Sequence, residues 1–546
     1  MKKIVKNKFN LISIVIGIST YFFIFGIDFF FSKSTFFLNM DHPLFLTGYL
    51  AFINDSWHFP LGVTNNIWPE YNFSIVWTDS IPIYSIVLKI IYTIFGIKLS
   101  NPFPLWYFIC YLLFAYFTGK IIQLKTTDLP TYIFATLLIV NTPLMLNRMI
   151  HHSGLSAHWL IVSAIYFYIL NKENDNKNLV KFAVYIGLSI YVHPYIFTIV
   201  FPIYFVTIAS EYLKSGFSKI KNSLLTLIGF LTFYFVGILS SIDFQSSSFR
   251  ASDYIKYRAE FNSFFCGEIP NALISEVLWC FRPYTSIDKE GYAYIGIGFI
   301  FLLIFLPINI KKVLKNIREN LFLTTTLSLM VIYSFGNIWK ISHVQLFEFQ
   351  PTYLHNELLE IFRAVGRYTW GFYYFLCIYL ILNVLKMRKK KIAMLILLVT
   401  VSLQLYEMEN IYSERQTIFR QFNPPEEQIQ LAQKIYTEDG EHMLYVLGDE
   451  RCTYPEYDHY IVALKYLEYG GVVYGTRTSR IKFDYQFCEN YNIEKSLNTY
   501  RPYHFLINEI EDFIDTSFKD DYICEVLPSY IDEKSSPAYC KLKVPK

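Results

Sequence analysis

The stretch that decides the fold covers residues 41–89, DHPLFLTGYLAFINDSWHFPLGVTNNIWPEYNFSIVWTDSIPIYSIVLK. It follows the first hydrophobic run directly, and it places two carboxylates, Asp41 and Asp79, among histidine and tryptophan residues at the expected depth of a membrane surface. An acidic side chain at that depth is costly, so it indicates a functional site. We therefore expect the other helices of the chain to hold a binding site over this segment.

Composition places the chain among polytopic membrane proteins. Its 546 residues are 53% hydrophobic and 19% aromatic but only 17% charged, and the mean hydropathy is +0.30, unlike an average soluble domain. The net charge of +3 is small and the basic residues stand in short clusters, so nucleic acid is not an expected partner. The first apolar run, 9–31, lacks a small-residue cleavage site and is long enough to span a bilayer.

Basic clusters between the apolar runs predict the topology. The runs are 9–31, 81–97, 102–119, 129–146, 158–170, 182–193, 195–210, 223–241, 293–309, 321–337, 368–385 and 392–407. If 81–97 crossed the membrane, every basic cluster from Lys120 onward would lie outside, against the positive-inside rule. A short helix that re-enters from the outer face places all the clusters inside. The sequence thus predicts a mainly α, polytopic bundle of about eleven spans plus one half-embedded helix, with a cytoplasmic N-terminus.

Two domains are expected, a transmembrane domain at 1–408 and a small extracytoplasmic α/β domain at 409–546. In the second, the patterns predict helices at 424–436 and 458–468 and strands at 442–447 and 471–474. It has no metal-ligand spacing, phosphate-binding loop or nucleophile elbow, which favours a lid or docking module. Six cysteines lie on segments assigned to the outer face, where disulfides are plausible. They are Cys266, Cys280, Cys452, Cys488, Cys524 and Cys540.

Each of the two carboxylates of the opening stretch has two interpretations. Asp41 is either a solvated loop carboxylate or a general base for an attacking hydroxyl group. The apolar run after it, which contains Trp57 and His58, is too hydrophobic to lie in water and favours packing at the membrane surface. Asp79 either caps the half-embedded helix, which has proline in its first turn, or is a second acid that binds a divalent metal or the acceptor.

A second outer loop, NRMIHHSGLSAHW at 147–159, is rich in cationic side chains. Its members are Arg148, His151, His152 and His158. Adjacent His151 and His152 point to different faces of any regular element, and His151 lies about 10 Å from His158 on a helix, so a shared metal is not expected. The loop either recognises a phosphate or holds histidines bonded to backbone. His193, at the outer end of another helix, could join it.

The segment IFRAVGRYTW at 361–370 carries Arg363 and Arg367, which an α-helix would place on one face. Two guanidiniums at the outer surface suit a phosphate because each offers a planar fork of donors. The positive-inside rule makes arginines unexpected there, which favours a function. An ion pair with Glu357 or Glu360 is the alternative.

The chain resembles the GT-C superfamily of polytopic glycosyltransferases, which use polyprenyl-phosphate sugars. The shared features are one span, a long outer loop with an early acid, a half-embedded helix that opens on proline, and a polar second outer loop. Four phrases, WHFPLG at 57–62, TDSIP at 78–82, HWL at 158–160 and FRAVGR at 362–367, are similar to an uncharacterised bacterial family of GT-C-like integral membrane proteins, over about residues 9–408.

The resemblance implies that Asp41 occupies the place of the catalytic acid of the first loop. The second outer loop has no acid where oligosaccharyltransferase-like members have a metal-binding pair. This difference makes the metal-independent, mannosyltransferase-like mode the expected one. We therefore expect no cofactor, and a divalent metal is not favoured.

Together these points predict an inverting glycosyltransferase of the bacterial cytoplasmic membrane, active at its outer face. Asp41 is the expected base and Asp79 shapes the acceptor side, with Trp57 and His58 at the acceptor or the interface. The expected donor and phosphate contacts are Arg148, His151, His152, His158, His193, Arg363 and Arg367. Its partners would be a lipid-linked sugar donor, membrane lipids, and a glycan or protein acceptor. The alternative is a non-catalytic translocase of lipid-linked glycans, for which charge pairs within spans are expected, or an envelope polysaccharide assembly protein.

Overall fold

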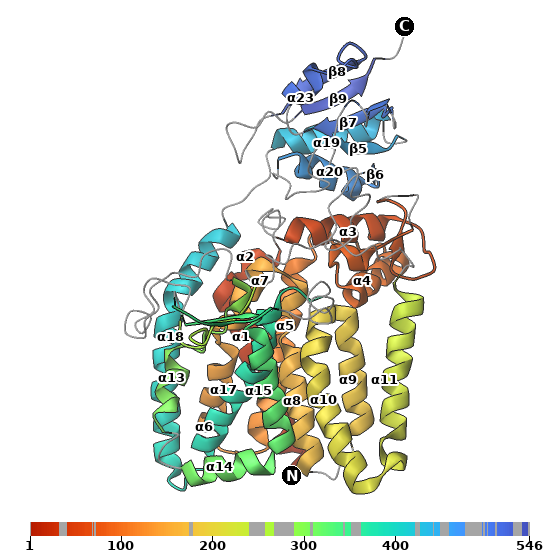
Figure 1. The fold of residues 1–546 in the computed structure, drawn as a ribbon. Coiled ribbons are helices and arrows are strands. Elements are labelled where there is room, and N and C mark those ends of the chain that lie inside the picture. The colour runs from red at the N-terminus through yellow and green to blue at the C-terminus, as the bar shows by residue number, and fades with distance from the viewer. Residues whose placement is uncertain are drawn as a thin grey trace.

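A helical bundle forms most of the molecule, with a small α/β body above it (Figure 1). In this computed structural model the N-terminus lies at the far end of the bundle from that body. The structure describes residues 2–31, 41–67, 69, 72–173, 178–239, 257–266, 289–305, 310–341, 344–350, 362–420, 426–439, 442–447, 458–474, 494, 497–498, 501–507, 510–527 and 538–543.

Seven helices of the described residues are long and apolar enough to cross a membrane. They include α1 (Lys2–Phe25), α5 (Phe103–Gln123), α8 (Trp159–Glu173), α10 (Pro194–Ser215), α11 (Phe217–Gly237), α17 (Thr369–Leu385) and α18 (Lys390–Arg420). The pair α6 (Leu129–Val140) and α7 (Pro143–His151), bent by 43°, makes an eighth if it is one span. The mainly helical fold is thus as predicted, and the seven candidate spans are consistent with a polytopic membrane protein, while the count of eleven spans stays a prediction.

Shorter helices complete the bundle. These are α9 (Leu179–Val192), α13 (Ile297–Leu303), α15 (Leu321–Ser334) and α14 (Ile310–Glu319), which lies across the lower end of the bundle (Figure 1). Large apolar side chains on the outer helices are exposed, among them Leu11, Phe23 and Phe235. Large exposed apolar side chains on several helices are unusual in a soluble protein but suit helices that contact lipid.

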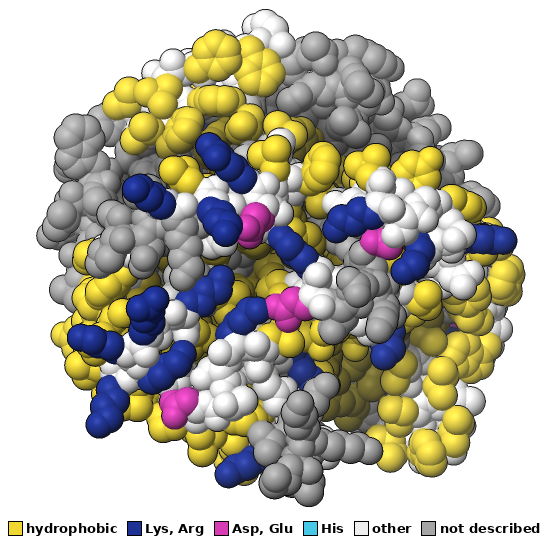
Figure 2. All heavy atoms as spheres, turned by 90° about the horizontal axis from the view of Figure 1, so that it is seen from below, with side chains coloured by type: hydrophobic (Ala, Val, Ile, Leu, Met, Phe, Trp, Pro, Cys, Tyr) yellow, Lys and Arg dark blue, Asp and Glu magenta, His cyan; other side chains and the backbone are white. Residues whose placement is uncertain are grey.

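Basic side chains gather on the lower face of the bundle (Figure 2). Lys125, Lys172 and Lys386, which belong to three of the clusters noted in the sequence, line one cavity there. Lys125 also pairs with Glu173 at the end of α8. These clusters therefore share one end of the bundle, as the positive-inside rule requires of cytoplasmic loops.

The opposite end of the bundle is covered by α3 (His42–Asn54) and α4 (Pro82–Phe95), joined through β1 (Val63–Thr64), β2 (Phe73–Ser74) and η3 (Ile75–Thr78). Residues 42–54, almost all of them apolar, were expected in the first outer loop, but they form the helix α3. This helix is buried along nearly its whole length, which explains that composition.

The prediction that Asp79 caps α4 is wrong. The N-cap is Ile81, and Pro82 begins the helix. Asp79 ends η3 in the left-handed region with φ of 52°, and Ile81 is left-handed as well with φ of 43°. Such angles are strained in residues other than glycine, and for a β-branched residue they are outliers. Backbone strain of this kind is found mainly at functional sites, where it fixes the orientation of a side chain, here that of Asp79.

The C-terminal body contains a five-stranded sheet in the order β6-β5-β7-β9-β8. The strands are β5 (Leu444–Leu447), β6 (Val473–Tyr474), β7 (His504–Ile507), β8 (Tyr522–Val526) and β9 (Ala538–Leu542), and the helices are α19 (Glu426–Asp439), α20 (Asp458–Tyr469) and α23 (Ile510–Ile514). β5 is parallel to β6 and β7, whereas β9 is antiparallel to β7 and β8. A disulfide joins Cys524 to Cys540 between the neighbouring strands β8 and β9. The expected elements at 424–436, 442–447, 458–468 and 471–474 correspond to α19, β5, α20 and β6.

Hydrogen bonds join this body to α3 and to the loop that follows α3. The Asn54 side chain at the end of α3 donates to the carbonyl of Leu467, at 2.5 Å. The backbone N–H of Val473 donates to the carbonyl of Asn66, at 3.0 Å. The C-terminal body therefore sits on α3 and on the loop that follows it.

Candidate active site

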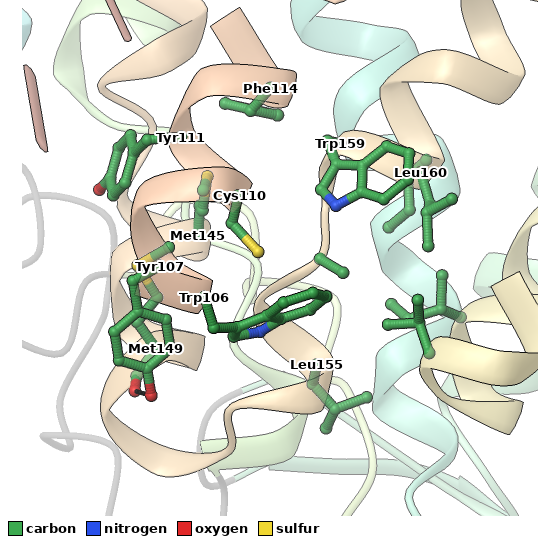
Figure 3. Close-up of a cluster of buried hydrophobic side chains, with 14 of the residues drawn as sticks. Trp106, Tyr107, Cys110, Tyr111, Phe114, Met145, Met149, Leu155, Trp159 and Leu160 are labelled. Atoms are coloured by element: carbon green, nitrogen blue, oxygen red, sulfur yellow. Dashed lines mark hydrogen bonds between the residues drawn. The ribbon is translucent and has the colours of Figure 1, made fainter. Parts of the chain in front are cut away.

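The site rests on an aromatic core between α5, α7 and α8 (Figure 3). Trp106 donates its indole N–H to the carbonyl of Ser153 at 2.9 Å, and the Tyr107 hydroxyl donates to the carbonyl of Met149 at 2.7 Å. Both acceptors belong to the loop that carries Arg148 and His152. The buried rings of α5 thus fix the backbone of the second outer loop, including η4 (Gly154–Ser156).

One part of the site is a carboxylate between two histidines. The Nε2 atoms of His152 and His193 lie 3.4 Å and 3.5 Å from the two carboxylate oxygens of Asp79. His152 ends α7, and His193 ends α9 and precedes α10. A Cβ on Gly154 would lie 3.1 Å from His193 and 3.5 Å from His152, so a glycine lets the loop approach both rings.

Backbone hydrogen bonds define the tautomer of both rings. Nδ1 of His193 accepts the N–H of Tyr195 at 3.1 Å, and Nδ1 of His152 accepts the N–H of Leu155 at 3.4 Å. Because Nδ1 is an acceptor, each neutral ring carries its proton on Nε2 and donates to Asp79. Burial raises the pKa of Asp79, but these two hydrogen bonds outweigh it and hold that pKa well below its usual range. Asp79 is therefore ionised and a weak base.

The same three residues have the composition of a metal site, with ligand atoms within 4.8 Å of one another. A metal on Nε2 needs the lone pair of that atom, so the proton must move to Nδ1, which then usually donates to a second-shell acceptor. Here Nδ1 of both rings faces a backbone N–H instead. The hydrogen bonds favour two donors to a carboxylate over two ligands of a metal.

The second part of the site is an ion triad that the sequence analysis missed in part. Arg148 and Arg367 both contact Oε2 of Glu290, at 2.9 Å and 2.6 Å. Arg148 is completely buried and lies over the ring of Trp370, while Arg367 lies 4.3 Å from the ring centre of Tyr195. Burial raises the pKa of Glu290, but the two arginines outweigh it and lower that pKa below its ordinary value. The triad itself carries one net positive charge, and both of its arginines are buried.

Glycines bring the elements of the triad together. Glu290 lies on η5 (Lys289–Gly291), and Arg367 lies on η7 (Val365–Tyr368). A Cβ on Gly366 would lie 2.6 Å from Cα of Gly291 and 2.9 Å from the carbonyl oxygen of Glu290. Only a glycine permits this approach of the two backbones.

The position of Asp41 near the ion triad follows from the contacts of the next residue, His42. The imidazole of His42 is buried, 2.8 Å from the Tyr107 hydroxyl and 3.2 Å from the carbonyl of Met149, one residue after Arg148. The Asp41 side chain does not cap α3, and its charge interacts with the guanidinium of Arg367. The structure therefore places Asp41 within electrostatic reach of Arg367.

Three other predicted residues lie outside this cluster. Arg363 packs over the ring of Tyr257 at 5.5 Å. The expected shared helical face with Arg367 is wrong, because residues 362–364 are irregular and the α-helix begins only at Thr369. Trp57 donates to the Thr93 hydroxyl, and His58 pairs with Asp55 at 3.1 Å, in a separate surface group.

His158 lies on the bundle side of the triad. Its Nδ1 is 2.6 Å from the Tyr374 hydroxyl, and its ring packs on Trp370, the residue beneath Arg148. It therefore supports the arginine and is not exposed to a ligand. The side chain of His151 lies outside the described residues, as do Glu357 and Glu360.

An apolar groove lies between helices that adjoin Asp79 and His193 in the sequence. It encloses about 500 Å³ between α4, α9 and α11, and its walls include Ile83, Val87, Tyr191 and Phe230. Ile83 follows Asp79 by four residues, and Tyr191 precedes His193 by two. A hydrocarbon chain in this groove would have its polar end next to the site.

The burial of His193 predicts a pH dependence of stability. Burial lowers the pKa of His193 to about 4, against about 6.5 in an unfolded chain. Between pH 6.5 and 4 the unfolded chain binds this proton and the folded chain does not, so stability falls by roughly 3 kcal/mol as the pH falls. Asp79 and Glu290 have lowered pKa values, so their contribution is lost only below about pH 4.

We expect the melting temperature of wild type to fall between pH 6.5 and 4, and that of His193→Gln to fall clearly less. The measurement is a thermal melt of purified protein across that range. His58→Gln, a histidine outside the site, is the control and should follow wild type. If the melting temperatures of wild type and His193→Gln fall in parallel with pH, the lowered pKa of His193 is contradicted.

Gly366→Ala should separate η5 from η7. The added methyl group overlaps backbone atoms of Glu290 and Gly291, so we expect a loss of about 1–3 kcal/mol in stability, as for an overpacked core. Gly229→Ala on α11 has open space around its Cβ and is the matched control, expected within about 0.5 kcal/mol of wild type. The measurement is a thermal melt of both variants. Equal melting temperatures would show that the close contact between η5 and η7 does not require glycine at position 366.

A comparison with protein families gives one match. A family model described as Domain of unknown function (DUF6311) matches residues 14–409. The matched range contains the whole candidate site and leaves out the C-terminal body. A search of curated proteins finds no match.

Proposed function

The chain belongs to the family described as Domain of unknown function (DUF6311), and from the site within the matched region we propose that it is a membrane glycosyltransferase. It moves a sugar from a polyprenyl-phosphate donor to a hydroxyl group of an acceptor, with inversion at the anomeric carbon and without a metal. The reaction takes place at the outer face of the bacterial cytoplasmic membrane.

The observation that carries the proposal is the pair of buried guanidiniums beside Asp41. Arg148 and Arg367 share a single carboxylate oxygen of Glu290. Two guanidiniums on one carboxylate leave the triad with one net positive charge, which suits the oxygens of a phosphate. In a buried site such donors stabilise the charge that develops on a departing phosphate.

The two aspartates have different roles. Asp41 removes the proton from the acceptor hydroxyl as its oxygen attacks the anomeric carbon. The bond from that carbon to the phosphate oxygen breaks, and the polyprenyl phosphate leaves with the electron pair. Asp79 is held ionised by His152 and His193, so it orients the acceptor and stabilises positive charge on the sugar ring.

The apolar groove suits the prenyl chain of the donor. It lies between α4, α9 and α11, and its walls include Ile83 and Tyr191, which stand close to Asp79 and His193 in the sequence. The chain would enter from the membrane and leave its phosphate at the arginines. This arrangement also explains why the groove has almost no polar side chains.

We assign eleven spans to the bundle: α1, α5, α6 with α7, α8, α9, α10, α11, α13, α15, α17 and α18. α4 is the half-embedded helix. The basic end of the bundle, seen in Figure 2, then faces the cytoplasm, and the C-terminal body lies outside.

The test uses full-length protein in vesicles with a panel of undecaprenyl-phosphate monosaccharides. We expect release of undecaprenyl phosphate from one donor, and inversion of the anomeric configuration in the product by NMR. Addition of EDTA should leave the rate unchanged, because the histidines serve as donors to Asp79. If the folded protein cleaves none of the undecaprenyl-phosphate sugars in the panel, the proposal is contradicted.

The ion triad also favours a second candidate, a non-catalytic translocase of lipid-linked glycans. Charges paired between elements of a bundle are a feature of transporters. This candidate predicts that a fluorescent lipid-linked sugar crosses the bilayer intact. Movement of the label without cleavage would favour the translocase, and cleavage without movement would favour the transferase.

A further inference from the structure

A second cavity lies at the basic end of the bundle, between α8, α14, α15 and α17. It encloses about 560 Å³, within the range of small-molecule sites. On α8 its residue Lys172 lies fourteen positions beyond His158, which corresponds to about 20 Å along a helix. The cavity is therefore separate from the candidate active site.

The floor of this cavity is apolar. Ile165 and Ile169 come from α8, Phe375 and Leu376 from α17, and Ile317 from α14. A soluble anion gains nothing from such a floor, whereas a hydrocarbon chain is stabilised by it.

The rim of the cavity is polar and mainly basic. Lys125, Lys172 and Lys386 line it, together with Glu173 and Glu319. The Lys172 ammonium donates to the Asn320 side chain at 2.6 Å and to the carbonyl of Glu319 at 3.1 Å, so two of its three donors are used. Lys172 is thus held at the edge of the apolar floor with one donor left for a ligand.

The helix α14 forms one wall and has the composition of a helix at a membrane surface. Lys311, Lys315 and Arg318 lie on it, and its Leu314 and the following Leu321 are more than half exposed. Basic and apolar side chains on one short helix favour the boundary between headgroups and hydrocarbon. The mouth of the cavity therefore lies at that boundary, on the face that Figure 2 shows to be rich in Lys and Arg.

We propose that this cavity binds an anionic glycerophospholipid from the leaflet at the basic end. One acyl chain lies on the apolar floor, and the phosphate contacts Lys172, with Lys125 and Lys386 nearby. Basic pockets between membrane helices bind anionic lipid headgroups in this manner. A zwitterionic lipid would fit the floor but would gain less from the rim.

The test is native mass spectrometry of the full-length protein with added dioleoylphosphatidylglycerol or dioleoylphosphatidylcholine. We expect phosphatidylglycerol to bind at least about tenfold more tightly. The double variant Lys172→Gln with Lys386→Gln should lose most of this preference. Lys219→Gln with Lys221→Gln, on the same end of the bundle but outside the cavity, should keep it.

A cavity-filling variant gives an independent measurement. Leu376→Trp keeps every charge but occupies the floor, so it should weaken the binding of both lipids. Inorganic phosphate at millimolar concentration should not displace phosphatidylglycerol. The proposal is wrong if phosphate competes fully, if the Lys172 and Lys386 variant binds like wild type, or if the control double variant loses as much. None of these outcomes depends on sugar transfer.

Discussion

Asp41→Asn should lower the rate of sugar transfer by about 10²–10⁴-fold, the usual contribution of a general base. Asparagine keeps the shape and size of the side chain but cannot take the proton of the acceptor. Because Asp41 does not cap α3, the fold should not depend on its charge. The measurement is the release of undecaprenyl phosphate, with a thermal melt to show that the variant is folded.

The matched control is Asp28→Asn. Asp28 lies on α2 (Ile27–Phe30), also just beyond the first span, and its side chain is exposed. We expect wild-type rates from this variant. A folded Asp41→Asn protein with wild-type turnover would remove Asp41 from the reaction and leave the site without a base.

Glu290→Gln should destabilise the protein by about 3–5 kcal/mol, because it removes the carboxylate that two buried guanidiniums share. It should also abolish transfer, since the orientation of Arg148 and Arg367 depends on that carboxylate. The measurement is the melting temperature together with the transfer rate. Glu319→Gln, which removes an exposed pair with Lys315, is the control and should cost at most about 1 kcal/mol.

A double variant tests whether Arg148 and Glu290 interact directly, as opposed to each substitution lowering stability independently. Arg148→Gln combined with Glu290→Gln should be more stable than the sum of the single losses predicts, because the second change removes one of the unpaired charges. Strict additivity would contradict a direct interaction. Equal melts for Glu290→Gln and Glu319→Gln would show that the triad does not hold the elements together.

Much of the architecture could be predicted because it depends on periodic signals. Apolar runs and lysine clusters recur along the whole chain, and the rule that places such clusters on one side of a membrane is general. The helix α3 could not be recognised in this way. It is buried on all sides between the bundle and the C-terminal body, so its sequence shows no polar face.

The sequence indicated four side chains of the candidate cluster but not the acid that joins two of them. Arg148, His152, His193 and Arg367 stand in polar segments next to apolar runs, where they are conspicuous. Glu290 lies in a long loop between two spans, and nothing in the local pattern distinguishes it from other loop acids. The one available signal was indirect, since two buried arginines require a counter-charge. Of the two interpretations of Asp79, the helix cap is wrong because Ile81 occupies the N-cap position of α4.

The helix α3 joins two parts of the molecule that were described separately above. Asp41 precedes its first residue, and Asn54 at its last residue is bonded to the C-terminal body. Thirteen helical residues make a stiff lever of about 20 Å. In the proposed reaction, α3 would therefore couple the binding of an acceptor at the C-terminal body to the removal of a proton by Asp41.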